Sequence, residues 1–114
     1  MAKQKAELLQ GTLDMLVLRV LTAGSMHGYA IARQIQKSSG NLLVVEEGSL
    51  YPALHRMKRR GWIQSEWGLS ESNRRAKYYK LTRVGRKQVD VQADRWHRLV
   101  QAIAGVMTLA GGEA

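Results

Sequence analysis

The stretch 48–63, GSLYPALHRMKRRGWI, constrains the fold of this chain more than any other segment. It contains the single proline of the sequence, a run of basic residues and a glycine directly after that run. On a helical wheel of about 100° per residue, one side of the segment collects the apolar residues Leu50, Ala53, Leu54 and Met57. Histidine, lysine and arginine gather on the opposite side. We therefore predict an amphipathic helix with one side in a core and a basic side facing outward.

The ends of this helix also have sequence signals. Ser49 is a candidate N-cap, because its hydroxyl can accept a hydrogen bond from a free backbone N–H of the first turn. That start would place Pro52 in the first turn, where a missing N–H costs no helical hydrogen bond. Gly61 suits the position just beyond the C-terminus, where a left-handed residue is favoured. The adjacent Glu46 and Glu47 suit a helix N-terminus and its dipole.

Two shorter helices are predicted upstream, at residues 8–21 and 29–37. The first has steps of three and four between its apolar residues, which are Leu9, Leu13, Leu16, Val17, Val20 and Leu21. The inner face of the second consists of Ile31, Ala32 and Ile35. The polar cluster 38–41 ends the second helix. The LLVV that follows is too short to distinguish a strand from a loop.

Downstream, residues 62–69 and 76–82 are rich in Trp, Ile, Tyr and Thr and predict a β-hairpin, because the polar turn SESNRR separates them. Thr82 then caps a long helix that extends to about Ala110. Its apolar residues alternate steps of four and three, which is typical of a coiled-coil seam: Val89, Ala93, Trp96, Val100, Ile103, Met107 and Ala110.

Three helices, a two-stranded hairpin and a further helix follow one another in the order of a winged helix-turn-helix. We therefore expect a mostly α fold with a two-stranded β-hairpin and a long C-terminal dimerisation helix. The expected division is a DNA-binding domain at 1–82 and a dimerisation helix with its tail at 83–114. A chain of 114 residues suits one such core.

The net charge of +9 is confined to one part of the chain. Residues 56–87 contain eleven basic and two acidic residues, while the rest of the chain contains seven of each. A local excess of this kind is typical of a surface that binds a polyanion. The alternative is a solvated basic face that serves solubility.

Several function classes are disfavoured by the sequence. The chain has no cysteine, which excludes disulfides and thiolate metal sites. His27, His55 and His97 are widely spaced and lack metal-ligand partners, and Ser49 has no nucleophile-elbow context. His27 suits a cap at the start of the second helix. We expect no enzyme, no metal and no cofactor. Without an apolar membrane span or a secretory signal, a cytoplasmic protein with no membrane anchor is expected.

In a winged helix-turn-helix, the recognition helix enters the major groove with its N-terminal residues nearest the bases. In this chain the recognition helix is the one predicted within the stretch 48–63. From it we predict DNA contacts by Ser49, Tyr51, Pro52, His55, Arg56, Lys58 and Arg59. Arg56 and Arg59 suit guanine edges or phosphate, whereas Lys58 suits phosphate. The Tyr51 hydroxyl suits phosphate, and His55 can donate to a base or to the DNA backbone. At the tip of the wing, the predicted contacts are Arg74, Arg75 and Lys77.

Three separated blocks, HGYAIARQI (27–35), GSLYPALHRMKRRGWI (48–63) and RRAKYYKLTRVG (74–85), resemble the signature of the PadR family of transcriptional regulators. A C-terminal region made of this one helix resembles that of the smaller PadR subfamily. The resemblance implies a dimeric winged-helix repressor whose last helix supplies much of the dimer interface. It further implies that Leu50, Tyr51 and Pro52 open the recognition helix, and that the wing is closed by Tyr79, Leu81 and Thr82. Helix propensity alone would disfavour Gly85 early in the last helix.

The seam of the last helix favours a homodimer independently, because a lone helix would expose its apolar stripe to water. Packing of this stripe on its own domain is the alternative. Trp96, with Val100 and Ile103, is a candidate for the dimer centre. In some small PadR-like regulators that sense drugs, a tryptophan of the last helix lines an apolar pocket there. The resemblance therefore also suggests a small aromatic effector, although a core anchor of the dimer is the simpler role for Trp96.

A dimer of this kind would bind double-stranded DNA at a pseudo-palindromic operator, with half-sites about one helical turn apart. The expected function is therefore a sequence-specific, ligand-responsive transcriptional repressor. Two alternatives stay open: an architectural DNA-binding protein that tolerates any sequence, and a protein-interaction module.

Overall fold

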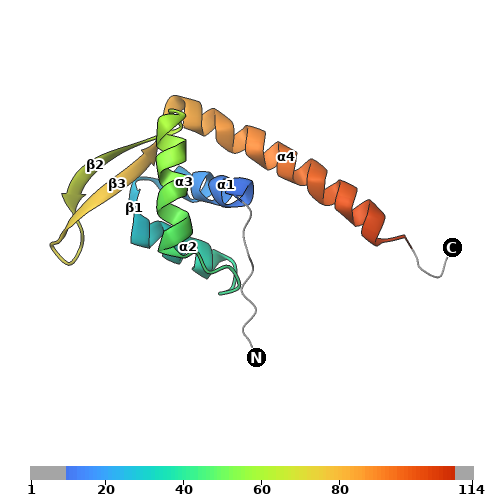
Figure 1. Ribbon diagram of the computed structural model, residues 1–114, viewed down its shortest axis with the longest axis horizontal. Coiled ribbons are helices and arrows are strands. Elements are labelled where there is room, and N and C mark those ends of the chain that lie inside the picture. Colours follow the sequence, from blue (N-terminus) through green and yellow to red (C-terminus); the bar gives the residue numbers. More distant parts are fainter. Residues whose placement is uncertain (1–9, 110–114) are drawn as a thin grey trace.

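The computed structural model describes residues 10–109 of the chain. In sequence order its elements are α1 (Gln10–Val20), the short 3₁₀ helix η1 (Leu21–Ala23), β1 (Met26–His27), α2 (Gly28–Ser38), α3 (Glu47–Arg59), β2 (Ile63–Leu69), β3 (Arg75–Leu81) and α4 (Arg83–Met107). The first three helices cluster beside the strands, and α4 projects away from this cluster (Figure 1). The predicted fold class, mostly helical with a small antiparallel sheet, is confirmed.

Within the described residues, the sheet has three strands in the order β1-β3-β2, so the prediction of two strands was incomplete. The hairpin β2–β3 is in full register from Ile63 opposite Leu81 to Leu69 opposite Arg75. The additional strand β1 is only two residues long and pairs with the middle of β3. Residues 42–45, which the sequence left open, adopt no regular secondary structure.

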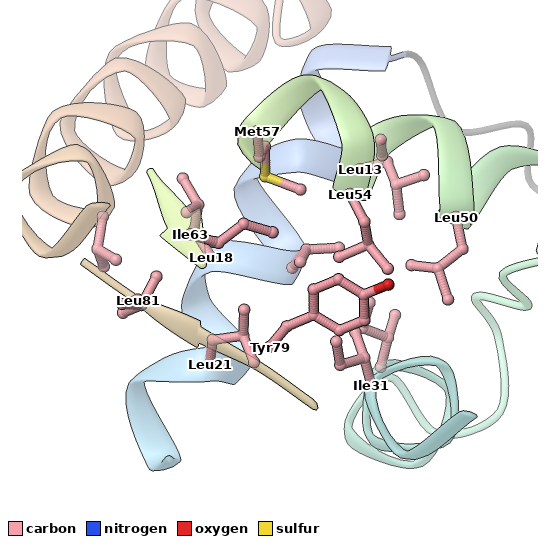
Figure 2. Packing of buried hydrophobic residues seen from close by; sticks show 14 residues of the cluster. Leu13, Leu18, Leu21, Ile31, Leu50, Leu54, Met57, Ile63, Tyr79 and Leu81 are labelled. Carbon is pink, nitrogen blue, oxygen red and sulfur yellow. The ribbon is translucent and has the colours of Figure 1, made fainter. Parts of the chain in front are cut away.

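The hydrophobic core lies between α1, α2, α3 and the root of the hairpin, as Figure 2 shows. The apolar side predicted for α3 is fully buried in it: Leu50, Ala53, Leu54 and Met57. In α2, Ile31 and Ile35 are buried as predicted. At about 2 kcal/mol for each large aliphatic side chain, this burial orients α3 and therefore fixes which of its sides faces outward.

The start of α3 differs from the prediction. The helix begins two residues before Ser49, so this serine is not the N-cap. The backbone N–H groups of Ser49 and Leu50 both donate to the Glu46 carbonyl oxygen, at 3.0 and 2.9 Å. Pro52 therefore lies inside the helix, where its ring removes the helical hydrogen bond to the Gly48 carbonyl. Because Gly48 and Pro52 are both exposed, water can hydrogen-bond that carbonyl, and burial of Leu50 holds the helix together.

The end of α3 agrees with the prediction. Gly61 has a φ of 78°, in the left-handed region that favours glycine. Its N–H donates to the Lys58 carbonyl at 3.0 Å, and the Trp62 N–H donates to the Met57 carbonyl at 2.9 Å. This pair of hydrogen bonds is a Schellman motif, which ends the helix and turns the chain into β2.

The start of α4 is held against the same turn. The Thr82 hydroxyl accepts a hydrogen bond from the Gly85 N–H at 3.0 Å, which confirms the predicted N-cap. The same hydroxyl donates to the Gly61 carbonyl at 2.6 Å. A Cβ at Gly85 would lie 1.9 Å from the Trp62 carbonyl oxygen, so only glycine fits at this position. Close packing, and not helix propensity, explains this glycine.

Candidate nucleic-acid interface

The outward side of α3 is polar and basic. His55, Lys58 and Arg59 are exposed, on the side of the helix opposite its buried residues. Ser49 and Pro52 are also exposed, in the N-terminal half of the helix. The structure thus brings five of the seven predicted α3 contacts to one accessible surface.

Tyr51 is turned partly toward the protein. It is 38% exposed, and a Cβ at Gly28 would lie 2.5 Å from its hydroxyl oxygen, so the ring lies against the first residue of α2. Burial and, secondly, the nearby Tyr51 raise the pKa of Tyr79 above its ordinary value. Tyr51 therefore packs α3 against α2 and β3 while its accessible part stays on the outer surface.

Arg56 does not join this surface. Its guanidinium donates to a carboxylate oxygen of Asp14 at 2.9 Å, and its side chain is only 20% exposed. Arg60 lies 3.7 Å from the other Asp14 oxygen. Burial raises the pKa of Asp14 above its ordinary value, while the hydrogen bond and charge of Arg56 oppose that rise. Arg56 thus ties α3 to α1, and its predicted contact with DNA stays a prediction.

The wing carries the second group of predicted contacts. Arg74 and Arg75 are exposed near its tip, and Lys77 is half-buried one step further along β3. Arg75 and Lys77 both lie over the ring of Trp67, with distances of 4.5 and 5.3 Å from the guanidinium carbon and the ammonium nitrogen to the ring centroid. Two of the three predicted wing cations are thus held by an aromatic side chain that the sequence reasoning did not single out.

The start of α2 adds residues that the sequence reasoning did not assign to the interface. His27 caps this helix as predicted, since its Nδ1 accepts from the Ala30 N–H at 3.2 Å. Tyr29 is 66% exposed, stacks on His27 and accepts a hydrogen bond from Arg33 at 3.3 Å. Tyr29 and Arg33 line the cleft between α2 and the N-terminal half of α3. The exposed pair Tyr29 and Arg33, spaced four residues apart, was the available sequence signal.

The seam of α4 divides into two parts. Val89 is buried against the core, whereas Trp96, Val100 and Ile103 are 43%, 40% and 51% exposed. The last seam residue predicted, Ala110, lies outside the described residues. Among residues 10–109, no group of three or more potential ligand side chains could hold a metal ion. Nor does that part of the chain contain a helix long and apolar enough to cross a membrane.

An exposed basic helix beside a basic hairpin, both carried on three packed helices, defines the winged helix-turn-helix class of DNA-binding proteins. Within this class the chain belongs to the PadR-like family of transcriptional regulators, whose family model matches residues 17–91. The predicted family is thereby confirmed. Members of this family are transcriptional regulators and not enzymes, which agrees with the predicted absence of catalysis.

Solved structures show the same fold. A transcriptional regulator from Clostridium thermocellum is 30% identical, with a TM-score of 0.77 over 84% of this chain and 93% of that chain. A PadR family transcriptional regulator from Eggerthella lenta is also 30% identical, with a TM-score of 0.73 over 88% and 85% of the two chains. Among curated proteins, an uncharacterized protein X from Lysinibacillus sphaericus is 23% identical over 87% of this chain and 91% of its own length.

Proposed function

We propose that the chain is a sequence-specific repressor that binds a pseudo-palindromic operator as a homodimer. The observation that carries this proposal is the accessible side of α3, where His55, Lys58 and Arg59 stand opposite a fully buried apolar side. Burial of one side prevents the helix from turning its basic side away from a ligand. Such a fixed, outward, cationic helix of a winged helix-turn-helix enters the major groove.

The roles of the side chains follow from their positions. Arg59 is exposed and has the fork geometry that pairs with the O6 and N7 atoms of guanine, so it is the proposed base contact of α3. Lys58 is proposed to contact phosphate, and Ser49, Tyr51 and Pro52 to line the groove near the start of the helix. On the wing, Arg74, Arg75 and Lys77 are proposed to neutralise flanking phosphates.

The proposed dimer rests on the apolar surface of α4. Several large apolar side chains of its second half are exposed, and this part of the helix extends away from the first three helices (Figure 1). Exposed apolar surface of this extent on a helix is typical of a partner interface. A second copy of the same helix supplies a matching surface through two-fold symmetry, and the symmetry also matches a pseudo-palindrome. Residues 83–114 would then act as the dimerisation element of the chain.

Trp96 is the proposed centre of effector binding in that dimer. It is partly exposed in the monomer, and two copies of it would face a shared apolar space near the two-fold axis. A flat aromatic compound that stacks there would release the operator if it favoured a different spacing of the two recognition helices. Quenching of Trp fluorescence by planar aromatic compounds tests this role, with Trp96→Leu as the variant that should lose the response.

A competition experiment separates the repressor from an architectural protein. A duplex enriched from a random pool by repeated selection should displace random duplex by a factor of at least about 10³ if the chain reads sequence. Equal competition by both duplexes would contradict sequence-specific binding. The same experiment tests the interaction-module alternative, because such a module would retain neither duplex.

Substitutions then test the two contact groups separately. Arg59→Ala should lower affinity for the selected duplex by about 10- to 100-fold and relax the preference at one base pair. The double variant Arg74→Ala/Arg75→Ala should weaken selected and random duplex alike and reduce the salt dependence of binding. An unchanged salt dependence in this double variant would show that the wing tip does not contact phosphate.

A further inference from the structure

One face of the wing combines two of the proposed DNA contacts, Arg75 and Lys77, with two exposed apolar side chains that have no proposed role, Trp67 and Leu69. In the hairpin register, Trp67 lies opposite Lys77 and Leu69 lies opposite Arg75. Because side chains alternate between the two faces of a strand, these four residues share the face that carries the buried Ile63 and Leu81 nearer the root. Beyond the core this face becomes accessible, and Trp67 and Leu69 are 58% and 63% exposed. We refer to Trp67, Leu69, Arg75 and Lys77 as the wing patch.

The two cations of the patch share one aromatic ring. The Arg75 guanidinium carbon is 4.5 Å, and the Lys77 ammonium nitrogen 5.3 Å, from the centroid of the Trp67 ring. The negative face of an indole attracts each cation and so offsets part of their mutual repulsion. A guanidinium that stacks on a ring keeps its N–H donors directed outward in its own plane. The cations are therefore positioned by Trp67 without losing their capacity to bind an anion.

The opposite face of the wing keeps this arrangement rigid. The Tyr78 hydroxyl donates to the Leu69 carbonyl oxygen at 2.9 Å, so its ring runs along the hairpin toward the tip. A Cβ at Gly68 would lie 3.1 Å from the Tyr78 ring, which shows how closely that ring covers the strand. At the tip, the Ser70 N–H donates to the Arg74 carbonyl at 2.8 Å and closes the turn. Contacts on the opposite face and at the tip thus stabilise the two strands that carry the wing patch.

We propose that Trp67 is a positioning residue for DNA binding: its ring holds Arg75 and Lys77 in place for their contact with the DNA backbone. Arg75 and Lys77 are two residues apart on one strand, about 6.7 Å, which is comparable with the separation of neighbouring phosphates on one DNA strand. Their charges neutralise two such phosphates, while the accessible part of Trp67 packs on the deoxyribose between them. The residues of β2 and β3 on this face include no carboxylate, so its charge complements DNA.

This inference rests on the proposed function, because it assumes that the wing lies beside the duplex that α3 reads. It goes further because it assigns the positioning of Arg75 and Lys77 to the aromatic ring of Trp67. A tryptophan that served only folding would affect the unfolding temperature of the protein. A positioning tryptophan instead affects the salt dependence of DNA binding, because each lost phosphate contact lowers the slope of log K against log salt by about 0.9.

The test uses the full chain and two selected duplexes, one that ends at the half-sites and one with additional flanking base pairs. Trp67→Leu keeps an apolar side chain but removes the ring, and should lower affinity for the longer duplex about 10-fold with a smaller salt slope. Trp67→Phe should restore most of both quantities, since a phenyl ring still attracts cations. All variants should keep the wild-type unfolding temperature within about 3 °C, and should bind the short duplex as the wild type does.

Leu69→Ala is the matched control, because Leu69 lies on the same face with similar exposure and contacts no cation through a ring. A loss in Leu69→Ala as large as that in Trp67→Leu would overturn the positioning role. The double variant Arg75→Ala/Lys77→Ala separates the role of Trp67 from the DNA contact of the wing itself. If it weakens binding while Trp67→Leu does not, the role of Trp67 is wrong and the wing contact stands. If neither weakens binding to the longer duplex, the wing contact itself is wrong.

Discussion

The two halves of α4 follow the same apolar pattern but have different surroundings. In the first half, Gly85 and Val89 are buried against the winged helix-turn-helix. In the second half, Trp96, Val100 and Ile103 continue the pattern and are exposed. A seam with steps of four and three therefore predicts that a helix has a partner, but it does not say whether that partner is its own domain or another chain.

We refer to the first half of α4, which is buried against the domain, as the anchored half. Its contacts also explain how α4 is connected to the recognition helix. The Trp62 N–H donates to Met57 in the last turn of α3, and the Trp62 carbonyl accepts from the Thr82 N–H at 3.0 Å. The same carbonyl is in close contact with Gly85. One residue thus joins the end of α3, the root of the wing and the first turn of α4, and the rest of α4 extends away from this junction (Figure 1).

The largest expected effect comes from a charge on the exposed half. Val100→Glu would place a carboxylate in the proposed interface, where an unpaired buried charge costs several kcal/mol. We expect the dimer to dissociate and the affinity for a selected duplex to fall at least about 100-fold. Sedimentation and DNA titration measure the two effects. Gln101→Glu is the control, because it adds the same charge to the same helix at a position outside the seam, about 100° around the helix from Val100.

If both variants remained dimeric, the seam would not be the interface. If Val100→Glu were instead unfolded at every concentration, the exposed half would have to pack on its own domain in solution. The two outcomes are distinguished by far-UV circular dichroism, since a dissociated but folded chain keeps its helical signal.

The next effect compares two glycines of the same helix. Gly85→Ala should destabilise the protein by about 3 kcal/mol, because its Cβ would overlap the Trp62 carbonyl and the backbone must move. A Cβ at Gly105 would meet no atom within 4 Å beyond its chain neighbours and the nearby backbone of its own helix. Gly105→Ala should therefore stabilise the helix by about 0.5–1 kcal/mol through propensity alone. Chemical denaturation measures both changes. Equal effects of the two substitutions would show that the first turn of α4 is not held against Trp62.

These glycines also show what the sequence could and could not predict. Features that depend on neighbours in the sequence were predicted: the buried side of α3, the left-handed Gly61 and the Thr82 cap all follow from local periodicity or capping. Gly85 was not explained, because its contact lies in another element. Strand β1 was missed for a related reason, since two residues show no periodicity and their partner strand lies about fifty residues further along the chain.

The candidate site shows the same limit. The wheel placed Arg56 near the exposed side of α3, and only its pairing with Asp14, 42 residues away, turns it inward. A carboxylate within the apolar stripe of α1 was the available signal for that pair. Pro52 led to a wrong prediction of the start of α3. The prediction assumed that a proline inside the helix would leave a backbone carbonyl without a hydrogen-bond partner, whereas water can bond that carbonyl here. Local chemistry thus predicted the faces, while long-range pairs decided individual side chains.

A third experiment uses the concentration dependence of unfolding. Val89→Ala removes buried methyl groups from the anchored half and should cost about 2 kcal/mol at every protein concentration. Ile103→Ala should lower stability only through the dimer, so its effect should shrink as the protein is diluted toward the dissociation constant of the wild type, where dimerisation stabilises neither protein. Thermal unfolding over a 100-fold range of concentration distinguishes them. A concentration-independent effect of Ile103→Ala would assign this residue to the monomer.

The smallest expected effect concerns the cap that joins the wing to α4. Thr82→Ala removes the hydroxyl that accepts from Gly85 and donates to the Gly61 carbonyl, at a cost of about 1–2 kcal/mol. Thr82→Ser keeps the hydroxyl and should recover most of this loss, so the comparison isolates the hydrogen bonds from the lost methyl group. Because the cap belongs to the anchored half, the loss should be independent of protein concentration. If it instead followed concentration, the first turn of α4 would contribute to the dimer and the two halves of the helix would act as one interface.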